Sequence, residues 1–499
     1  MAGSSSKLIA GRIRDLENAA DYPSWREIAL ELDQLEGADA WKLDEVGDDY
    51  DYMLIRERLD QMRQLRSRGD VRRLVHELAE GLHGNLGNTA NPVLYAYARV
   101  GTKKLVQDYV DEAANCLRYV CDGRFEDFGD AEKRQFFERT GASFGRSALL
   151  LSGGATLGMF HLGVIKALWD SGLLPRVISG SSAGAIIASM VATRSDDEVP
   201  ELFDAQNLNL QSFEGISLRQ VFSQGALMEP APLEECLTRN IRAGSFLEAF
   251  ERTGRMLGVT VSPAETNQQP RLLNYLTAPN VIVRSAVLAS CAVPGVYPSV
   301  MLEALDYSGA TVPYMRSKRW IDGSIANDLP MLRLARLHNV NHYIVSQTNP
   351  HVVPFMRDPT LRAHGFFSVA RELALLSSRG ALKVARQYSS SFAGGRIVDA
   401  LNDMLQQRYS GDVSIFPHHS PAKLMRMFSN LSAEEIQRYI WEGERATWPK
   451  LERIRVQTRI SRTFDDCLAA LKDQGQQRDA QLREDAVPPR RLRRRLDRR

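Results

Sequence analysis

The chain has little cysteine and no apolar leader at its N-terminus. Its 499 residues include only five cysteines, an odd number. They are scattered along the chain without the spacing of a metal-binding motif, namely Cys116, Cys121, Cys236, Cys291 and Cys467. The first ten residues lack the apolar run of a signal peptide. We therefore expect a reducing compartment and a cytoplasmic location, with no cofactor and no metal site.

The chain also lacks a large net charge. It has 63 basic and 61 acidic residues, which gives +2. Seven arginines and one aspartate lie between Arg490 and Arg499, so this segment carries +6 and the remaining residues carry −4. We therefore expect no nucleic-acid-binding body. We predict a disordered basic tail over residues 476–499, which either binds an anionic membrane surface or is a solvated end.

Long runs without charge are rare as well. Two windows, Ser147 to Ile165 and Val177 to Thr193, contain no Asp, Glu, Lys or Arg. Both are rich in glycine and serine, which is typical of buried strand-loop-helix units and not of membrane spans. We therefore expect a buried parallel sheet here.

The second window holds a short apolar strand, a tight turn and an apolar helix. Gly180, Ser182 and Gly184 follow the Gly-x-Ser-x-Gly spacing of a nucleophile elbow. Small residues on both sides of the serine let strand and helix pass closely while the hydroxyl projects outward. The N-terminus of the helix directs amides and a positive dipole end at the serine. The pattern predicts that Ser182 is a nucleophile.

The first window holds a strand over residues 148–151, a glycine-rich turn, and an apolar helix over residues 159–169. A glycine-rich turn at a helix start can bind an anion. Met159 and Phe160 follow Gly158 where a phosphate loop needs Lys and Ser or Thr, and the turn lacks a dinucleotide Gly-x-Gly pair. The remaining interpretation is that the backbone amides of this turn bind a transient oxyanion. The turn lies beside the elbow if both strands belong to one parallel sheet.

A carboxylate follows a later strand. Residues 319–322 read as a strand that ends at Asp322, and Gly323 gives the backbone freedom to turn the carboxylate into a cleft. Further elements are predicted as strands at residues 255–261, 343–346 and 413–416 and as a helix at residues 285–291. The regions before residue 140 and after residue 350 read mainly as helices.

With these motifs in order, the middle of the chain resembles the patatin-like phospholipase family. The flanks resemble its triacylglycerol lipase branch, as in yeast lipid-droplet lipases and the plant seed-oil lipase. The matching segments are Asp51-Tyr52, Gly81 to Asn88, Gly101 to Lys103, Asp322 to Ser324, Asp328 to Met331, Asn341 to Gln347 and Gly443 to Leu451.

The resemblance implies an α/β, patatin-like three-layer fold with a central, mostly parallel sheet. It implies a helical N-terminal domain over residues 1–140, a catalytic domain over 145–350 and a helical C-terminal region over 351–475. It also implies hydrolysis of acylglycerol esters through a Ser-Asp dyad, with Ser182 as nucleophile and Asp322 as general base. The amides of Gly153, Gly154 and Ala155 would form the oxyanion hole.

The glycine loop departs from the family pattern at two positions. Ala155 replaces the third glycine and Leu157 replaces a basic residue. Backbone amides survive both changes, so the oxyanion hole is still expected. The loss of a cation favours a neutral glyceride over a phospholipid, and the partners expected are therefore a lipid substrate and a peripheral lipid, membrane or lipid-droplet surface.

Three alternatives stay open from the sequence. A histidine after Asp322 could complete a triad, and the candidates are His338, His342, His351, His364, His418 and His419. The same machinery could act as a phospholipase A or lysophospholipase on membrane lipids. The chain could also be a catalytically idle lipid-surface scaffold, although intact Ser182 and Asp322 argue against this.

Overall fold

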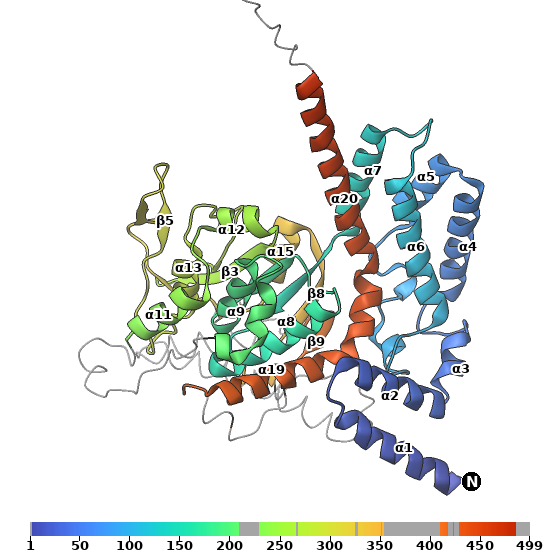
Figure 1. Ribbon diagram of the computed structural model, residues 1–499, viewed down its shortest axis with the longest axis horizontal. Coiled ribbons are helices and arrows are strands. Elements are labelled where there is room, and N and C mark those ends of the chain that lie inside the picture. Colours follow the sequence, from blue (N-terminus) through green and yellow to red (C-terminus); the bar gives the residue numbers. More distant parts are fainter. Residues whose placement is uncertain are drawn as a thin grey trace, which may run out of the picture. The chain divides into compact units, whose positions relative to one another are not determined.

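The computed structural model describes residues 2–208, 229–265, 268–324, 328–350, 352–353, 410–417, 423 and 429–485. The chain divides into two compact units (Figure 1). The first unit contains Met1–Asp44, Ala90–Lys103 and Arg146–Thr458, and the second contains Glu45–Thr89, Lys104–Gly145 and Arg459–Arg499.

A seven-stranded sheet organises the first unit. Its order is β4-β3-β2-β1-β8-β9, and β7 also pairs with β3. All pairs are parallel except those that β4 and β7 make with β3. The strands are β1 (Arg146–Leu151), β2 (Val177–Gly180), β3 (Met256–Pro263), β4 (Arg271–Leu273), β7 (Trp320–Asp322), β8 (Val340–Ser346) and β9 (Val413–Ile415). The structure confirms every strand predicted from the sequence.

Apolar residues cover both faces of this sheet, because alternate side chains of a strand point in opposite directions. Leu149 and Leu151 of β1 join one buried cluster, while Ala148 and Leu150 join a second. The larger cluster contains residues of α8 (Phe160–Asp170), α9 (Ala183–Ala192) and α13 (Val283–Ser290). The smaller contains Leu334 of α15 (Met331–His338). Helices therefore lie on both faces, which confirms the three-layer α/β fold.

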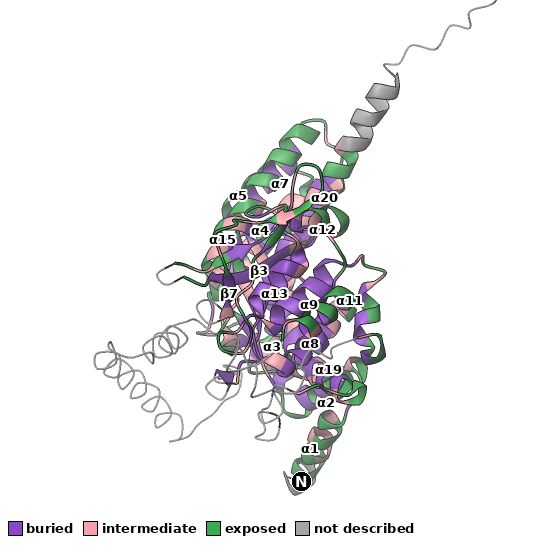
Figure 2. Ribbon diagram, turned by 90° about the vertical axis from the view of Figure 1, so that its left-hand side faces the viewer, coloured by how far each residue is buried: buried purple, intermediate pink, exposed green. Residues whose placement is uncertain are grey.

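The helix α9 lies at the centre of the larger core. All ten of its residues are buried, which explains why its sequence is apolar on every side. Figure 2 shows α9, α13 and β3 together as the most continuously buried part of this unit. The two charge-free windows are therefore strand-loop-helix units, as the sequence predicts. Among the described residues, no helix combines the length and apolar character needed to cross a bilayer.

The remaining elements of the first unit are short helices and one hairpin. They are α1 (Ala2–Glu17), α2 (Tyr22–Leu35), α3 (Ala38–Leu43), η2 (Pro92–Tyr95), η3 (Ala155–Met159), η4 (Val199–Phe203), η5 (Ala205–Asn207), α11 (Ala231–Asn240), α12 (Phe246–Thr253), the pair β5 (Glu303–Leu305) and β6 (Thr311–Pro313), α19 (Ala433–Thr447) and η7 (Trp448–Lys450). The helix α20 (Leu451–Asp485) begins in this unit.

The second unit is helical. Besides the later part of α20, it contains α4 (Tyr52–Arg68), α5 (Val71–Gly81), η1 (Leu86–Asn88), α6 (Lys104–Asp122) and α7 (Asp130–Phe144). Gly69 ends α4 in the left-handed region (φ 69°), and the carboxylate of Asp70 caps α5 by accepting from the amide of Arg73. One helix therefore ends and the next begins at these two residues.

The units do not follow the predicted segments. Residues 1–44 belong to the first unit, whereas most of the predicted N-terminal domain belongs to the second. Helix α20 runs through Asp485, ten residues into the region predicted as disordered from 476. Its polar composition was taken as a sign of disorder, but Gln, Arg, Asp and Ala are compatible with a helix that continues from a packed one. Residues 486–499, with the arginine run, lie outside the described residues.

Helices α8 and α19 lie side by side and meet at glycines (Figure 1). A Cβ atom on Gly163 of α8 would lie 1.8 Å from the carbonyl oxygen of Ile440. One on Gly443 of α19 would lie 2.2 Å from the oxygen of Phe160. The backbones therefore touch, and no side chain fits between them.

Gly163→Ala should lower the thermal stability of the protein, because the added methyl group forces α8 and α19 apart. Overpacking of this kind costs about 1–3 kcal/mol of the free energy of unfolding. Gly11→Ala in α1 is the matched control, because nothing lies within 4 Å of its Cβ position. Differential scanning calorimetry should show a lower melting temperature for Gly163→Ala alone. Equal melting temperatures would contradict the close contact.

Candidate active site

The structure places Ser182 between β2 and α9, where the strand turns sharply into the helix. Its backbone has φ 52° and ψ −123°, a conformation that costs energy for a residue with a side chain. A Cβ on Gly180 would lie 2.2 Å from the oxygen of Gly184, and a Cβ on Gly184 would lie 2.2 Å from the oxygen of Leu151. Both glycines are therefore required by close backbone contact, as expected for a nucleophile elbow.

A buried serine of α13 holds the elbow in place. The amide of Ser182 donates to Oγ of Ser290 (3.0 Å), whose hydroxyl donates to the carbonyl oxygen of Thr260 (2.7 Å). The hydroxyl of Ser181 donates to the carbonyl oxygen of Asp328 (2.9 Å). These bonds fix the strained turn from two directions. The role of Ser290 was not predicted, because a serine near the end of an apolar helix carries no local signal.

Asp322 ends β7 directly beside Val261 of β3 and is 1 % exposed. A Cβ on Gly323 would lie 2.3 Å from the oxygen of Thr260, so only glycine allows this turn. Oδ1 of Asp322 accepts from the amide of Ser324 (2.8 Å), whereas the buried Oδ2 has no hydrogen-bond partner among the described residues. One carboxylate oxygen is therefore available to accept a proton.

Burial raises the pKa of Asp322 to about 6, against hydrogen bonds from Ser324 and from the side chain of Ser182 that lower it. Gly153 lies against both Ser182 and Ser324, and the amide of Ser324 binds Asp322, so the two predicted catalytic residues lie close together. A carboxylate with this pKa is a better base than one in water and is still ionised at neutral pH.

The glycine loop lies against Ser182. A Cβ on Gly153 would lie 3.4 Å from the Cβ atoms of Ser182 and Ser324. However, the amide of Gly153 donates to Oδ1 of Asp328 (3.0 Å), so in this arrangement it does not face an oxyanion as predicted. The structure shows no acceptor among the described residues for the amides of the next two residues, Gly154 and Ala155. Two of the three predicted donors therefore remain.

Asp328 is a second buried carboxylate at the site. Its Oδ2 accepts from the side-chain amide of Asn349. Burial, followed by the charge of Asp322, raises the pKa of Asp328 to about 7, although the amide of Gly153 and the side chains of Gln347 and Asn349 lower it. Asp328 lies in one of the segments that resemble the lipase branch, but its sequence context predicts no role for it.

The fully buried His161 contacts the start of the glycine loop. Its Nε2 lies 3.0 Å from the carbonyl oxygen of Ser152 and its Nδ1 lies 2.7 Å from Oγ of Ser346. Because a carbonyl only accepts, Nε2 carries the hydrogen and Nδ1 accepts from the serine. Burial lowers the pKa of His161 to about 4, so the ring is neutral. The hydroxyl of Thr348 donates to the carbonyl oxygen of Gly153 (2.9 Å), which completes the support.

The described candidate triad histidines lie elsewhere. His338 stacks on Tyr275 at the end of α15. His342 contacts Oγ of Ser147 and Oε1 of Gln457, near the amino ends of β8 and β1. Neither bonds to Ser182 or Asp322. The other four candidates, His351, His364, His418 and His419, lie outside the described residues.

Two family models match the chain. Residues 149–335 match the model described as patatin-like phospholipase, and residues 7–142 match a domain of unknown function, DUF3336. The triacylglycerol lipase ptl3 of Schizosaccharomyces pombe is 34% identical over 87% of this chain and 92% of its own length. The chain belongs to the patatin-like phospholipase family.

Other members of the patatin-like family extend the similarity. Triacylglycerol lipase SDP1L of Arabidopsis thaliana is 37% identical, over 91% of this chain and 58% of its own length. Triacylglycerol lipase 4 of Saccharomyces cerevisiae is 35% identical, over 87% of this chain and 50% of its own length. The chain thus spans between half and three fifths of the length of these two relatives. VipD of Legionella pneumophila, a solved structure, is 14% identical over 65% of this chain and 67% of its own, with a TM-score of only 0.28.

Ser290→Ala should slow the covalent labelling of Ser182 by a fluorophosphonate probe. The change leaves the amide of Ser182 and the carbonyl of Thr260 without their partner, and an unsatisfied buried group costs about 1–3 kcal/mol. We expect labelling to slow by roughly tenfold or more. Ser189→Ala is the matched control, because the hydroxyl of this buried serine in α9 has no described partner. Similar rates in both variants would show that Ser290 does not support the elbow.

Proposed function

We propose that this protein is a serine ester hydrolase that acts as a triacylglycerol lipase through a Ser182-Asp322 dyad. One observation carries the proposal: the unpartnered Oδ2 of a buried Asp322 lies at the same site as a serine held on a strained elbow. The names of the relatives, triacylglycerol lipases of a plant and two yeasts, support the substrate class.

The proposed reaction has two steps. Asp322 accepts the proton of Ser182 while the serine oxygen attacks the ester carbonyl, and the alcohol leaves with the returned proton. Water then attacks the acyl-enzyme and releases the fatty acid. The amides of Gly154 and Ala155 and the N-terminus of α9 stabilise the negative oxygen in both steps.

Leu157 favours a neutral glyceride over a phospholipid as substrate. It stands where the family loop has a basic residue, and here it is 1 % exposed within the larger apolar core. The loop therefore presents no cation at this position to a phosphate group. Asp322 and Asp328 add two acidic groups nearby, which would oppose an anionic head group.

Purified protein should release fatty acid faster from triolein than from phosphatidylcholine presented in the same emulsion. Ser182→Ala and Asp322→Asn should each lose activity by at least about 100-fold, because each removes one member of the dyad. Circular dichroism controls for folding. Faster release from phosphatidylcholine would make the protein a phospholipase A with the same dyad, and full activity of Asp322→Asn would exclude the dyad.

The rate of ester hydrolysis should fall as the pH falls through about 6, because Asp322 accepts a proton only when it is ionised. A water-soluble short-chain ester is used as the substrate, because it stays dissolved across the pH range. The pKa of Asp328 is raised to about 7, so the contribution of Asp328 to the pH profile must be distinguished from that of Asp322. Asp328→Asn keeps an acceptor for the amide of Gly153 and should retain the fall near pH 6. Loss of that fall in Asp328→Asn would assign it to Asp328 instead.

A further inference from the structure

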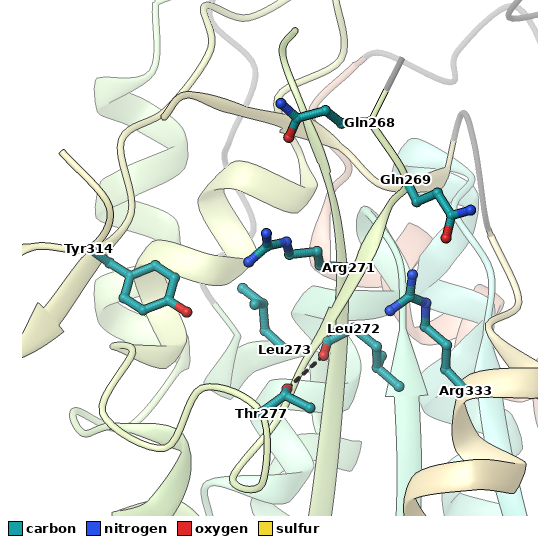
Figure 3. Close-up of a pocket in the computed structure, with 8 residues that line it drawn as sticks. All are labelled: Gln268, Gln269, Arg271, Leu272, Leu273, Thr277, Tyr314 and Arg333. Atoms are coloured by element: carbon teal, nitrogen blue, oxygen red, sulfur yellow. Dashed lines mark hydrogen bonds between the residues drawn. The ribbon is translucent and has the colours of Figure 1, made fainter. Parts of the chain in front are cut away.

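A polar pocket lies beside β4, the strand at one side of the sheet, near the strand ends that hold Ser182 and Asp322. Its volume is about 440 Å³. Apart from two leucines of β4, it is lined by Gln268, Gln269, Arg271, Thr277, Tyr314 and Arg333. Figure 3 shows Arg271 entering from β4 and Arg333 from α15, with Tyr314 on the side of Arg271 and Gln269 next to Arg333. We call this the arginine pocket.

The arginine pocket lies at the level of the catalytic groups. Arg271 and Asp322 are both paired with Val261, on opposite sides of β3. Residues paired directly across strands point to the same face of a sheet. Two strand spacings separate the two backbones, about 10 Å. The side chain of Arg271 is therefore on the same face as the proposed general base.

The two guanidinium groups have no acidic partner among the described residues. The guanidinium of Arg271 lies 5.5 Å from the ring centre of the buried Trp320, and its Nη1 donates to Sδ of Met315 (3.7 Å). A cation–π contact and a weak hydrogen bond to sulfur thus hold this cation in place, and its other donors have no partner among the described residues. By contrast, the nearby Lys318 is paired with Glu265 (3.3 Å). An ordered guanidinium with open donors suits a phosphate group.

Exposed apolar side chains occur in the segments that line the arginine pocket. Leu332 is 65 % exposed, Leu276 is 51 % exposed and Met315 is 40 % exposed. Each is the chain neighbour of a residue that lines the pocket. Cations combined with exposed apolar side chains are typical of surfaces that bind a lipid interface, where phosphate groups lie beside acyl chains. A pocket for a soluble anion would need no such apolar surroundings.

We propose that the arginine pocket docks the protein on an anionic phospholipid surface, with Arg271 and Arg333 binding lipid phosphate groups and the neighbouring apolar side chains entering the interface. This inference builds on the proposed lipase function, since it brings the Ser182 edge of the sheet to the lipid that holds the substrate. The arginines bind the surface and take no part in ester cleavage.

Vesicle sedimentation of the full chain tests the proposal, with Ser182→Ala in every protein so that no lipid is consumed. Binding should be stronger to vesicles of phosphatidylcholine with phosphatidylserine than to phosphatidylcholine alone. The double variant Arg271→Ala/Arg333→Ala should bind the anionic vesicles about 25-fold more weakly, about fivefold for each charge. Circular dichroism confirms that the variants are folded.

The matched control is Arg176→Ala/Arg438→Ala, which removes the same charge elsewhere. Arg176 precedes β2 at the opposite end of the strands and Arg438 is exposed on α19. Retained binding in the control, together with loss in the pocket variant, supports the proposal. Equal loss in both variants, no loss in the pocket variant, or equal binding to the two vesicle types overturns it. Binding of glycerol 3-phosphate without vesicle binding overturns it too, because the pocket would then be a soluble phosphate site.

Hydrolysis of a water-soluble ester separates this inference from the proposed function. With Ser182 restored, Arg271→Ala/Arg333→Ala should cleave such an ester as fast as the unchanged protein. If the unchanged protein binds vesicles through the pocket but cleaves no ester, the lipase proposal fails and the docking surface stands. If the unchanged protein cleaves the ester but its vesicle binding does not depend on Arg271 and Arg333, only the docking proposal fails.

Discussion

The close approach of three backbone segments at the elbow is the constraint on which the rest of the site depends. Gly184 lies against the carbonyl of Leu151 and Gly180 lies against the carbonyl of Gly184, so β1, β2 and α9 leave no room for a side chain at either glycine. This crowding forces Ser182 into an unfavourable backbone conformation. The conformation persists because buried apolar residues fix the strands and the helix on every side. The packing of these segments thus fixes the position of Ser182, the proposed nucleophile.

The sequence predicts those parts of the site whose signals are local. Ser182 and Asp322 each stand at the end of an apolar strand beside a glycine, and such a pattern spans only a few residues. The support of the glycine loop and of the elbow was not predictable in this way. Asp328 meets Gly153 from 175 residues away, and Ser290 meets Ser182 from 108 residues away. Such contacts depend on the order of the strands and on which face of the sheet each helix covers. Neither property can be predicted from a short segment of the sequence.

The predicted segments differ from the compact units for a related reason. Helical periodicity shows that residues 1–140 contain helices, but it does not show which core each helix joins. The motif around Gly443 was recognised without a role, and the structure explains it as packing. Gly443 touches α8, Glu444 pairs with Lys166 (2.8 Å), and Arg445 donates to the last two carbonyls of α1 and to that of Ala19 beyond it. One turn of α19 thus connects the first residues of the chain to the catalytic unit.

The position of β8 has a consequence for where this enzyme domain ends. The patatin-like match stops at residue 335, yet β8 begins at Val340 and lies between β1 and β9 in the sheet. A protein cut at that boundary would leave β1, the strand that leads into the oxyanion loop, as an open edge with unpaired amides and carbonyls. The segment that matches the family model is therefore smaller than the folding unit to which it belongs. Strands β8 and β9, which lie outside the match, cover an edge of β1 that would otherwise favour aggregation.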